Sequence, residues 1–248
     1  MSEHAPVHHR KAVTLTIIVA ALGYFVDIYD LVLFGIVRVE SLIGLGVPES
    51  DLLSEGVVLL NTQMGGMLVG GILWGILGDK KGRLSVLFGS IFIYSAANIA
   101  NGFVESVETY AVLRVVAGIG LAGELGAGIT LVSELMPAET RGYGTTIVAT
   151  VGILGAVAAA LVGDSFEWRT AYFVGGGMGL VLLVLRIGVY ESGMFSRLRE
   201  AKVERGNILS LFQQGRLKRY ASVILIGVPI WYAVAVLVTF SPEMGKAR

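Results

Sequence analysis

Residues Gly75 to Arg83 read GILGDKKGR and separate two long apolar segments of the chain. Asp79, Lys80, Lys81 and Arg83 lie within this short stretch, whereas the segments on either side of it carry no charge. Charged side chains are costly in hydrocarbon, and an irregular loop there would leave backbone groups without hydrogen-bond partners. The stretch therefore predicts a tight turn at a membrane surface, where its glycines allow two helices to approach closely.

The composition is that of an integral membrane protein. Of the 248 residues, 54% are hydrophobic and 15% are charged, and the mean hydropathy is +0.75. A soluble domain would carry about a quarter charged residues. The net charge of zero gives no reason to expect nucleic-acid binding. The chain has no cysteine, and its three histidines lie in the polar N-terminal tail, so neither a metal site nor a cofactor is predicted.

Seven apolar segments each approach the ~20 residues that a bilayer requires. They cover residues 13–38, 56–77, 85–104, 109–134, 144–163, 170–190 and 220–240. If the N-terminus is cytoplasmic, the cytoplasmic segments contain 13 of the 19 lysines and arginines, and the opposite loops are acidic. Basic residues favour the cytoplasmic side, so we expect a multi-pass protein with a cytoplasmic N-terminus.

The charged turn resembles the loop between the second and third helices of major facilitator superfamily transporters, G-x-L-A-D-R-x-G-R-K. Gly75, Leu77, Asp79, Gly82 and Arg83 match this pattern. Lys80, Gly78 and Leu84 depart from it.

A weak internal repeat agrees with this resemblance. Gly78-Asp79 to Arg83 echoes Gly163-Asp164 to Arg169, and the two turns would lie on opposite sides of the membrane. An inverted three-plus-three repeat predicts this relation. The resemblance implies an all-α polytopic membrane protein: the N-terminal six-helix bundle plus a seventh helix, with the C-terminal half missing. The expected parts are a cytoplasmic tail (1–12), the bundle (13–190), a cytoplasmic linker (191–219) and the first helix of an incomplete C-terminal half (220–248).

Two carboxylates stand inside the first apolar segment. Asp27 is near its middle and Asp30 follows by three residues, so both side chains share one helix face. Because carboxylates are expensive in hydrocarbon, we expect them to face the bundle interior or a water-filled cavity and to carry protons. The alternative is a structural role, in which they form hydrogen bonds to neighbouring helices.

The residues around these carboxylates carry a further resemblance. Gly23-x-x-x-Asp27-Ile28-Tyr29-Asp30-x-x-x-Phe34-Gly35 resembles the first helix of the metabolite:proton symporters. It also resembles the D-x-Y-D of phosphate:proton symporters. Asp27 stands where Glu is common and Ile28 where Trp is common, which leaves the substrate open.

The fourth segment contains a second pair of charged candidates. Arg114, with Gly118 and Gly120, resembles the family's R-x-x-x-G-x-G, which the resemblance links to proton coupling. A buried arginine requires an anionic partner, here Asp30, Asp27 or a substrate, unless it snorkels to the outer headgroups. Gly123-Glu124 is similar to the G-E step of metabolite and sugar symporters. Glu124 is a second titratable group or substrate contact, or equally a structural bond to a facing helix.

Two further sets of residues complete the candidate sites. Tyr29, Phe34, Gln63 and Asn98 are candidates to line a cavity, the two amides with the alternative of bonding between helices. Glu134 and Arg141-Gly142 resemble the family's E-x(6)-R-G, which implies a conformational latch that holds the outward-facing state. The latch candidates are Gly75, Asp79, Gly82, Arg83, Glu134 and Arg141. Exposed ion pairs contribute little stability individually, so the latch would select between two conformations.

Together these features predict a secondary active transporter in the plasma membrane, not an enzyme. It would be a proton-coupled symporter of a small metabolite, such as an organic acid, phosphate or another anion, working by alternating access. Its partners would be that substrate, protons and the lipid bilayer.

Two alternatives stay open. One is a non-transporting truncated half, or a subunit that needs a missing C-terminal half or a second copy. The other is a seven-helix sensor or receptor, which only the helix count suggests. A retinal-type photoreceptor would want a lysine inside the last segment, and residues 220–240 contain none.

Overall fold

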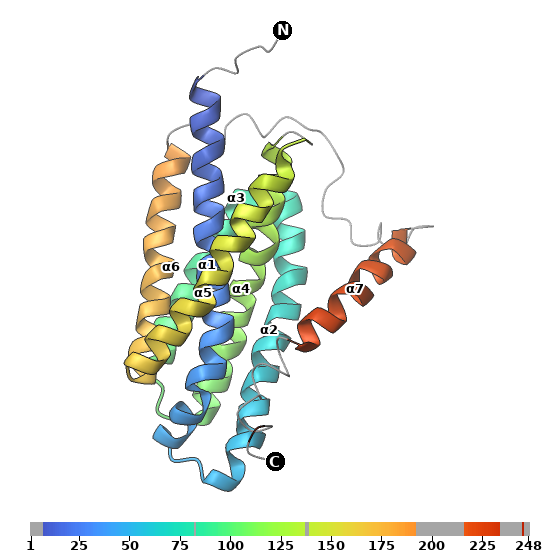
Figure 1. Cartoon of the computed structure of the whole chain (residues 1–248). Helices are drawn as coiled ribbons and strands as arrows, with labels where there is room; N and C mark the ends of the chain where they lie inside the picture. The colour runs from blue at the N-terminus through green and yellow to red at the C-terminus, as the bar shows by residue number, and fades with distance from the viewer. Residues whose placement is uncertain (1–6, 82, 137–138, 192–215, 234–244, 246–248) are drawn as a thin grey trace. The chain divides into compact units, whose positions relative to one another are not determined.

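The structure of the chain is a computed structural model that describes residues 7–81, 83–136, 139–191, 216–233 and 245. These residues form seven α-helices and one short 3-10 helix (Figure 1). The elements are α1 (Val7–Gly44), η1 (Glu49–Asp51), α2 (Leu52–Lys81), α3 (Arg83–Asn101), α4 (Val107–Leu135), α5 (Arg141–Ser165), α6 (Trp168–Glu191) and α7 (Arg216–Tyr232). Each of the seven predicted segments is therefore helical, although residues 234–240 of the seventh lie outside the described residues.

The chain divides into two compact units, residues 1–202 and 203–248. The first unit contains α1 to α6. The second contains α7, a 17-residue helix with Pro229 inside it. All candidate site residues belong to the first unit, and the predicted linker at 192–215 lies outside the described residues.

The connection between α2 and α3 is shorter than the sequence predicts. Gly75 to Lys81 continue α2 and α3 begins at Arg83, so only Gly82, which is outside the described residues, separates the two helices. The predicted bounds of 56–77 and 85–104 therefore end the second helix four residues early and begin the third two residues late. Two lysines in the last turn of α2 explain why the helix continues, because cations stabilise the carboxyl end of a helix dipole.

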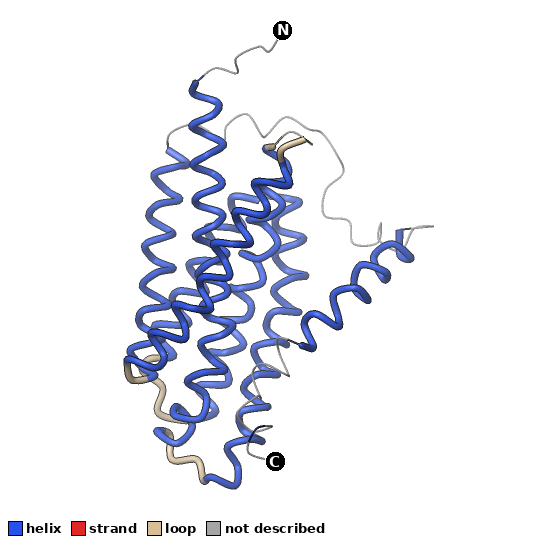
Figure 2. Tube along the Cα trace, viewed as in Figure 1, coloured by secondary structure: helices blue, strands red, loops and turns tan. Residues whose placement is uncertain are grey.

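Helices α1 to α6 pack lengthwise into one bundle (Figure 1). The described loops between them are short, so consecutive helices run in opposite directions (Figure 2). The most extensive contacts join α1 to α5 and α2 to α4, followed by α3 with α4 and α6. In an inverted repeat, α1, α2 and α3 correspond in order to α4, α5 and α6. The α1–α5 pair therefore corresponds to the α4–α2 pair. The packing therefore has the equivalence expected of an inverted three-plus-three repeat.

Glycines bring both of these equivalent helix pairs close together. A Cβ atom added at Gly66 of α2 would strike the backbone carbonyl of Val115 in α4. In the same way, a Cβ at Gly155 of α5 would strike the carbonyl of Phe25 in α1. Helices in lipid associate through such close backbone contact, since they gain little from burying apolar side chains against one another.

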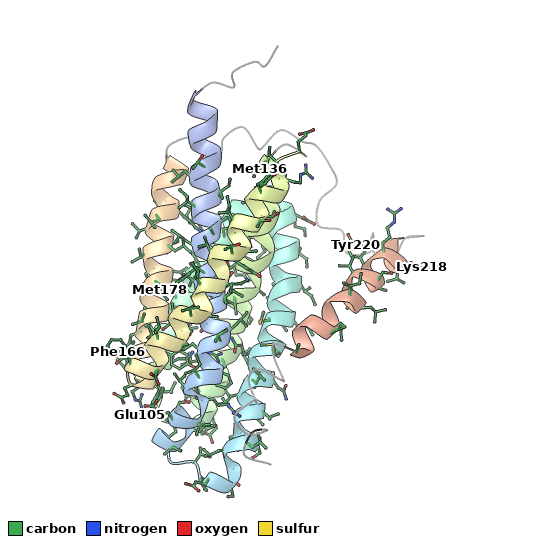
Figure 3. The ribbon with its side chains drawn as sticks, viewed as in Figure 1. Glu105, Met136, Phe166, Met178, Lys218 and Tyr220 are labelled. Carbon is green, nitrogen blue, oxygen red and sulfur yellow. The ribbon has the colours of Figure 1, made fainter. Side chains whose placement is uncertain are left out.

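The two ends of the bundle differ in charge. Figure 3 places Glu105 and Phe166 at one end and Met136 at the other. Glu105 is an exposed acid, whereas the exposed Lys80 and Lys81 terminate α2 at the end that Met136 marks. This distribution is the one that the positive-inside rule associates with a cytoplasmic and an outer face.

Four of the described helical stretches are long and apolar enough to cross a membrane by length and composition. They are Ile17–Gly44, Glu49–Lys81, Arg141–Ser165 and Trp168–Ile187. Ser85–Asn101 is a shorter apolar helix. These stretches come from both halves of the six-helix bundle, so the bundle as a whole is a multi-pass membrane unit.

Gly66→Ala is expected to lower the melting temperature of the purified protein. The new Cβ would meet the α4 backbone, and overpacking of this kind costs about 1–3 kcal/mol. Gly71→Ala is the matched control on α2, because a Cβ there has no atom within 4 Å. It should leave the melting temperature unchanged or raise it, since alanine favours the helix. Equal melting temperatures for the two variants would contradict the packing role of Gly66.

Candidate functional site

Arg114 of α4 is the centre of a buried polar network. Its side chain is fully buried, so it does not extend to the surface. Its Nη1 lies 3.7 Å from Asp30 Oδ1 of α1, and its Nη2 donates to Gln63 Oε1 of α2. Gln63 Nε2 in turn donates to Asp30 Oδ2 at 3.0 Å. The amide thus connects the cation and the carboxylate, and three helices meet at this point.

Aromatic side chains surround the guanidinium of Arg114. The centre of the Phe34 ring is 4.6 Å from its Cζ atom, and that of Tyr172 is 5.7 Å away. Nη1 also donates to the Tyr172 hydroxyl at 3.5 Å, and this hydroxyl is hydrogen-bonded to that of Tyr110. A desolvated cation gains from contact with aromatic faces, so these rings stabilise Arg114 inside the bundle.

A second buried ion pair joins α4 to α6. Arg186 Nη2 is 2.6 Å from Glu124 Oε2, and Nη1 donates to Glu124 Oε1 at 2.7 Å. Nη1 also donates to the Leu87 carbonyl at 2.9 Å, and Ser90 Oγ donates to Glu124 Oε1 at 2.7 Å. This hydrogen bond and the short ionic contact together hold the guanidinium and the carboxylate in one geometry. Of the alternatives for Glu124, the bond to a facing helix is present.

Asp27 differs from the other two buried carboxylates. Its side chain is 1% exposed, yet neither of its carboxylate oxygens has a hydrogen-bond partner in the structure. It lies within the electrostatic reach of Glu124, Arg186 and Asp30. An ionised carboxylate buried without a partner is strongly disfavoured, so Asp27 is suited to hold a proton.

The structure assigns the two aspartates to different neighbours. Asp30 belongs to the network of Arg114, whereas Asp27 interacts electrostatically with Glu124 and Arg186 and bonds to neither. Residues three apart on a helix differ in direction by about 60°, which lets one face serve two neighbouring groups. Among the described residues, no group of three or more acids and histidines has the arrangement of a metal site.

Arg186 is the functional candidate that the sequence analysis missed. It stands in the apolar sequence LLVLRIGVY of the sixth segment. The available signal is that an ionisable residue inside a membrane segment is by default a candidate for function and requires a partner. Arg38 was missed in the same way and is also buried, at 1% exposure near the end of α1.

The proposed cavity residues are all buried in the bundle. The Tyr29 hydroxyl donates to the Ala171 carbonyl at 2.9 Å and so joins α1 to α6. Phe34 packs on Arg114, Gln63 bridges Arg114 and Asp30, and Asn98 of α3 is completely buried. Two of the four therefore contact the charged centre directly.

The latch candidates lie at the end of the bundle where α2 and α4 finish and α5 begins. Gly75 and Asp79 are exposed near the end of α2, and Arg141 is exposed at the start of α5. A Cβ at Gly75 would have open space around it. Gly82 and the side chains of Arg83 and Glu134 lie outside the described part of the chain.

The chain is similar in sequence to a known family of membrane proteins. The model of the Major Facilitator Superfamily matches residues 20–246. The "Probable 4-methylmuconolactone transporter" of Cupriavidus pinatubonensis is 27% identical over 216 residues, which cover 83% of this chain and 50% of that protein. The 4-hydroxybenzoate transporter PcaK of Acinetobacter baylyi is 28% identical over 177 residues, which cover 70% of this chain and 38% of that protein.

The chain spans about half the length, or less, of these curated relatives. Both relatives are described as transporters and neither as an enzyme. Among solved structures, the xylose transporter XylE from E. coli in a partially occluded, inward-open conformation has a TM-score of 0.70 with 19% identity. The match covers 94% of this chain and 67% of that chain, and at this identity it concerns the fold alone.

Proposed function

Because the chain belongs to the Major Facilitator Superfamily, we propose that it forms the N-terminal bundle of a transporter that couples protons to the movement of a small organic anion. One observation carries this proposal. A fully buried arginine, Arg114, holds Asp30 inside the bundle, and a second buried carboxylate, Asp27, has no hydrogen-bond partner. Charges at this depth are retained at a cost, which favours a role in transport over packing alone.

Proton coupling would use the two aspartates. A proton carrier must bind and release its proton between the two sides of the membrane, and a carboxylate without fixed partners can do so with little rearrangement. Asp27 meets this condition in the structure. Asp30 would be the second site, because protonation would weaken its contact with Arg114 and so free the guanidinium.

The freed guanidinium is the proposed contact for the substrate. Arg114 presents a planar fork of donors, which suits the two oxygens of a carboxylate. Phe34 and Tyr172 flank it, and aromatic rings favour contact with a ring on the substrate. Small aromatic acids fit this chemistry, and 4-hydroxybenzoate, which one relative is described as transporting, is a suitable first probe.

Alternating access would involve a second bundle. We propose that it comes from a C-terminal half of the same protein or from a second copy of the chain, because the relatives are about twice as long as the matched region. The N-terminus and the basic end of the bundle would face the cytoplasm in the plasma membrane. If the folded protein shows no uptake, this result would support the alternative that the chain is a bundle that does not transport.

Asp30→Asn is expected to abolish proton-driven accumulation of 4-hydroxybenzoate by proteoliposomes that contain the full chain. The amide cannot release a proton, so the driving force no longer acts on the substrate. Asp164→Asn is the matched control, because Asp164 is exposed at the end of α5 and contacts neither charged centre. Accumulation by Asp30→Asn at the wild-type level against the same pH gradient would remove Asp30 from the coupling mechanism.

Asp79→Asn is expected to change the ratio of inward to outward accessibility, because Asp79 is part of the proposed latch. The chain has no cysteine, so a single cysteine introduced at Asn98, a buried candidate to line the cavity, is the only labelling site and would be reached from the side to which the cavity is open. Labelling rates would be compared from the two sides of the membrane, with Asp164→Asn again as control. An unchanged ratio in Asp79→Asn would eliminate its latch role.

A further inference from the structure

Two buried carboxylates share the neighbourhood of one guanidinium. Arg186 is paired with Glu124 through both of its terminal nitrogens. Asp27 feels the charges of both members of this pair but bonds to neither. Two carboxylates beside one guanidinium carry one surplus negative charge, and a single proton removes it.

Arg186 lies directly against the helix face that carries Asp27. A Cβ atom added at Gly23 of α1 would be 2.6 Å from Arg186 Nη2 and 3.3 Å from Glu124 Oε2. Gly23 precedes Asp27 by four residues, and side chains at this spacing are about 5–6 Å apart on one helix face. Because position 23 has no side chain, the Arg186 guanidinium lies against α1 one helical turn from Asp27.

The other buried arginine of this region is not available to Asp27. Arg114 is occupied by Asp30, Gln63 and Tyr172. Glu124, in contrast, keeps its bond from Ser90 when Arg186 leaves. When Arg186 leaves, it gives up its hydrogen bonds to Glu124 Oε1 and the Leu87 carbonyl, and Glu124 is left with the Ser90 hydroxyl as its donor.

We propose that Arg186 is a positioning residue that pairs with either Glu124 or Asp27, so that the two carboxylates hold one proton between them. In the structure Arg186 pairs with Glu124, and in this pairing Asp27 would hold the proton. When the guanidinium moves to Asp27, the proton moves to Glu124, and the total charge stays the same. Proton occupancy on α1 is then tied to an ion pair between α4 and α6.

Other groups near Asp27 set the conditions for this exchange. The charged and titratable residues that face it are Tyr24 and Asp30 from α1, Tyr94 from α3, Glu124 from α4 and Arg186 from α6. From α5, Gly152 and Gly155 pack against this part of α1 and bring no charge. In the proposed function Arg186 would regulate the proton site at Asp27, and in this respect the proposal rests on that function. The pairing of Arg186 with either carboxylate does not depend on transport.

Infrared spectroscopy of the purified full chain in lipid tests the exchange, because a protonated carboxyl and a carboxylate have separate C=O bands. The wild type is expected to show a protonated-carboxyl band near neutral pH that is lost in Asp27→Asn. Glu124→Gln should also lose this band, because Arg186 then pairs with Asp27 and keeps it ionised. Arg186→Gln should show about twice the band area, because both carboxylates then require a proton.

Arg186→Lys retains the positive charge and is expected to restore the single band. A purely structural ion pair would lower the melting temperature in the Glu124 and Arg186 variants without changing the band. Persistence of the band in Glu124→Gln would overturn the proposal, as would an unchanged band area in folded Arg186→Gln. If Arg186→Gln does not fold, the isosteric Glu124→Gln decides alone.

The spectroscopic result is separate from the result of the uptake assay. The bands report protonation in the purified protein whether or not 4-hydroxybenzoate is transported. Loss of the band in Glu124→Gln without any uptake by the wild type would support the shared counter-ion and reject the proposed substrate. Proton-driven uptake with bands that do not respond to Glu124→Gln would support the transporter and reject the role of Arg186.

Discussion

The burial of Arg114 is the constraint on which the rest of the bundle depends. A guanidinium taken out of water needs an anionic partner and acceptors for its donors. Asp30, Gln63 and Tyr172 provide these groups from α1, α2 and α6, so three helices must meet α4 at one level. Close packing makes this possible, since a Cβ at Gly118 of α4 would strike the backbone carbonyl of Gln63. The glycines therefore allow the close helix contacts that the buried charges require.

Arg186 adds a second positive centre to the part of the bundle in which Asp27, Asp30 and Glu124 are buried. Arg114 and Arg186 each have one close partner, Asp30 and Glu124, and Asp27 has none. A proton on Asp27 would complete the charge balance of this region, which connects the buried charges of the fold to the proposed coupling. The proposed exchange of Arg186 between Glu124 and Asp27 would give this network two pairings, and two alternative states are what a two-state transporter requires.

Hydropathy and motif resemblance were sufficient to predict the fold. The seven helical segments and the resemblance to major facilitator transporters are confirmed, because apolar length and glycine spacing are local properties of the chain. The second helix continues to Lys81, four residues beyond its predicted end, because the lysines in its last turn favour the carboxyl end of a helix. The pair of Glu124 and Arg186 was not predicted, because these residues are 62 positions apart and only the packing of α4 and α6 brings them together. The i,i+3 spacing placed Asp27 and Asp30 on one face but did not show that they have different neighbours.

The most direct test of proton coupling is to measure proton entry while the substrate enters. 4-Hydroxybenzoate would be added outside proteoliposomes that contain the full chain and an entrapped pH indicator. The substrate then has an inward-directed concentration gradient, and no pH gradient is imposed. The account predicts that the lumen becomes more acidic in step with uptake, because each anion enters with at least one proton. Uptake of the anion through the protein with no change in luminal pH would contradict it.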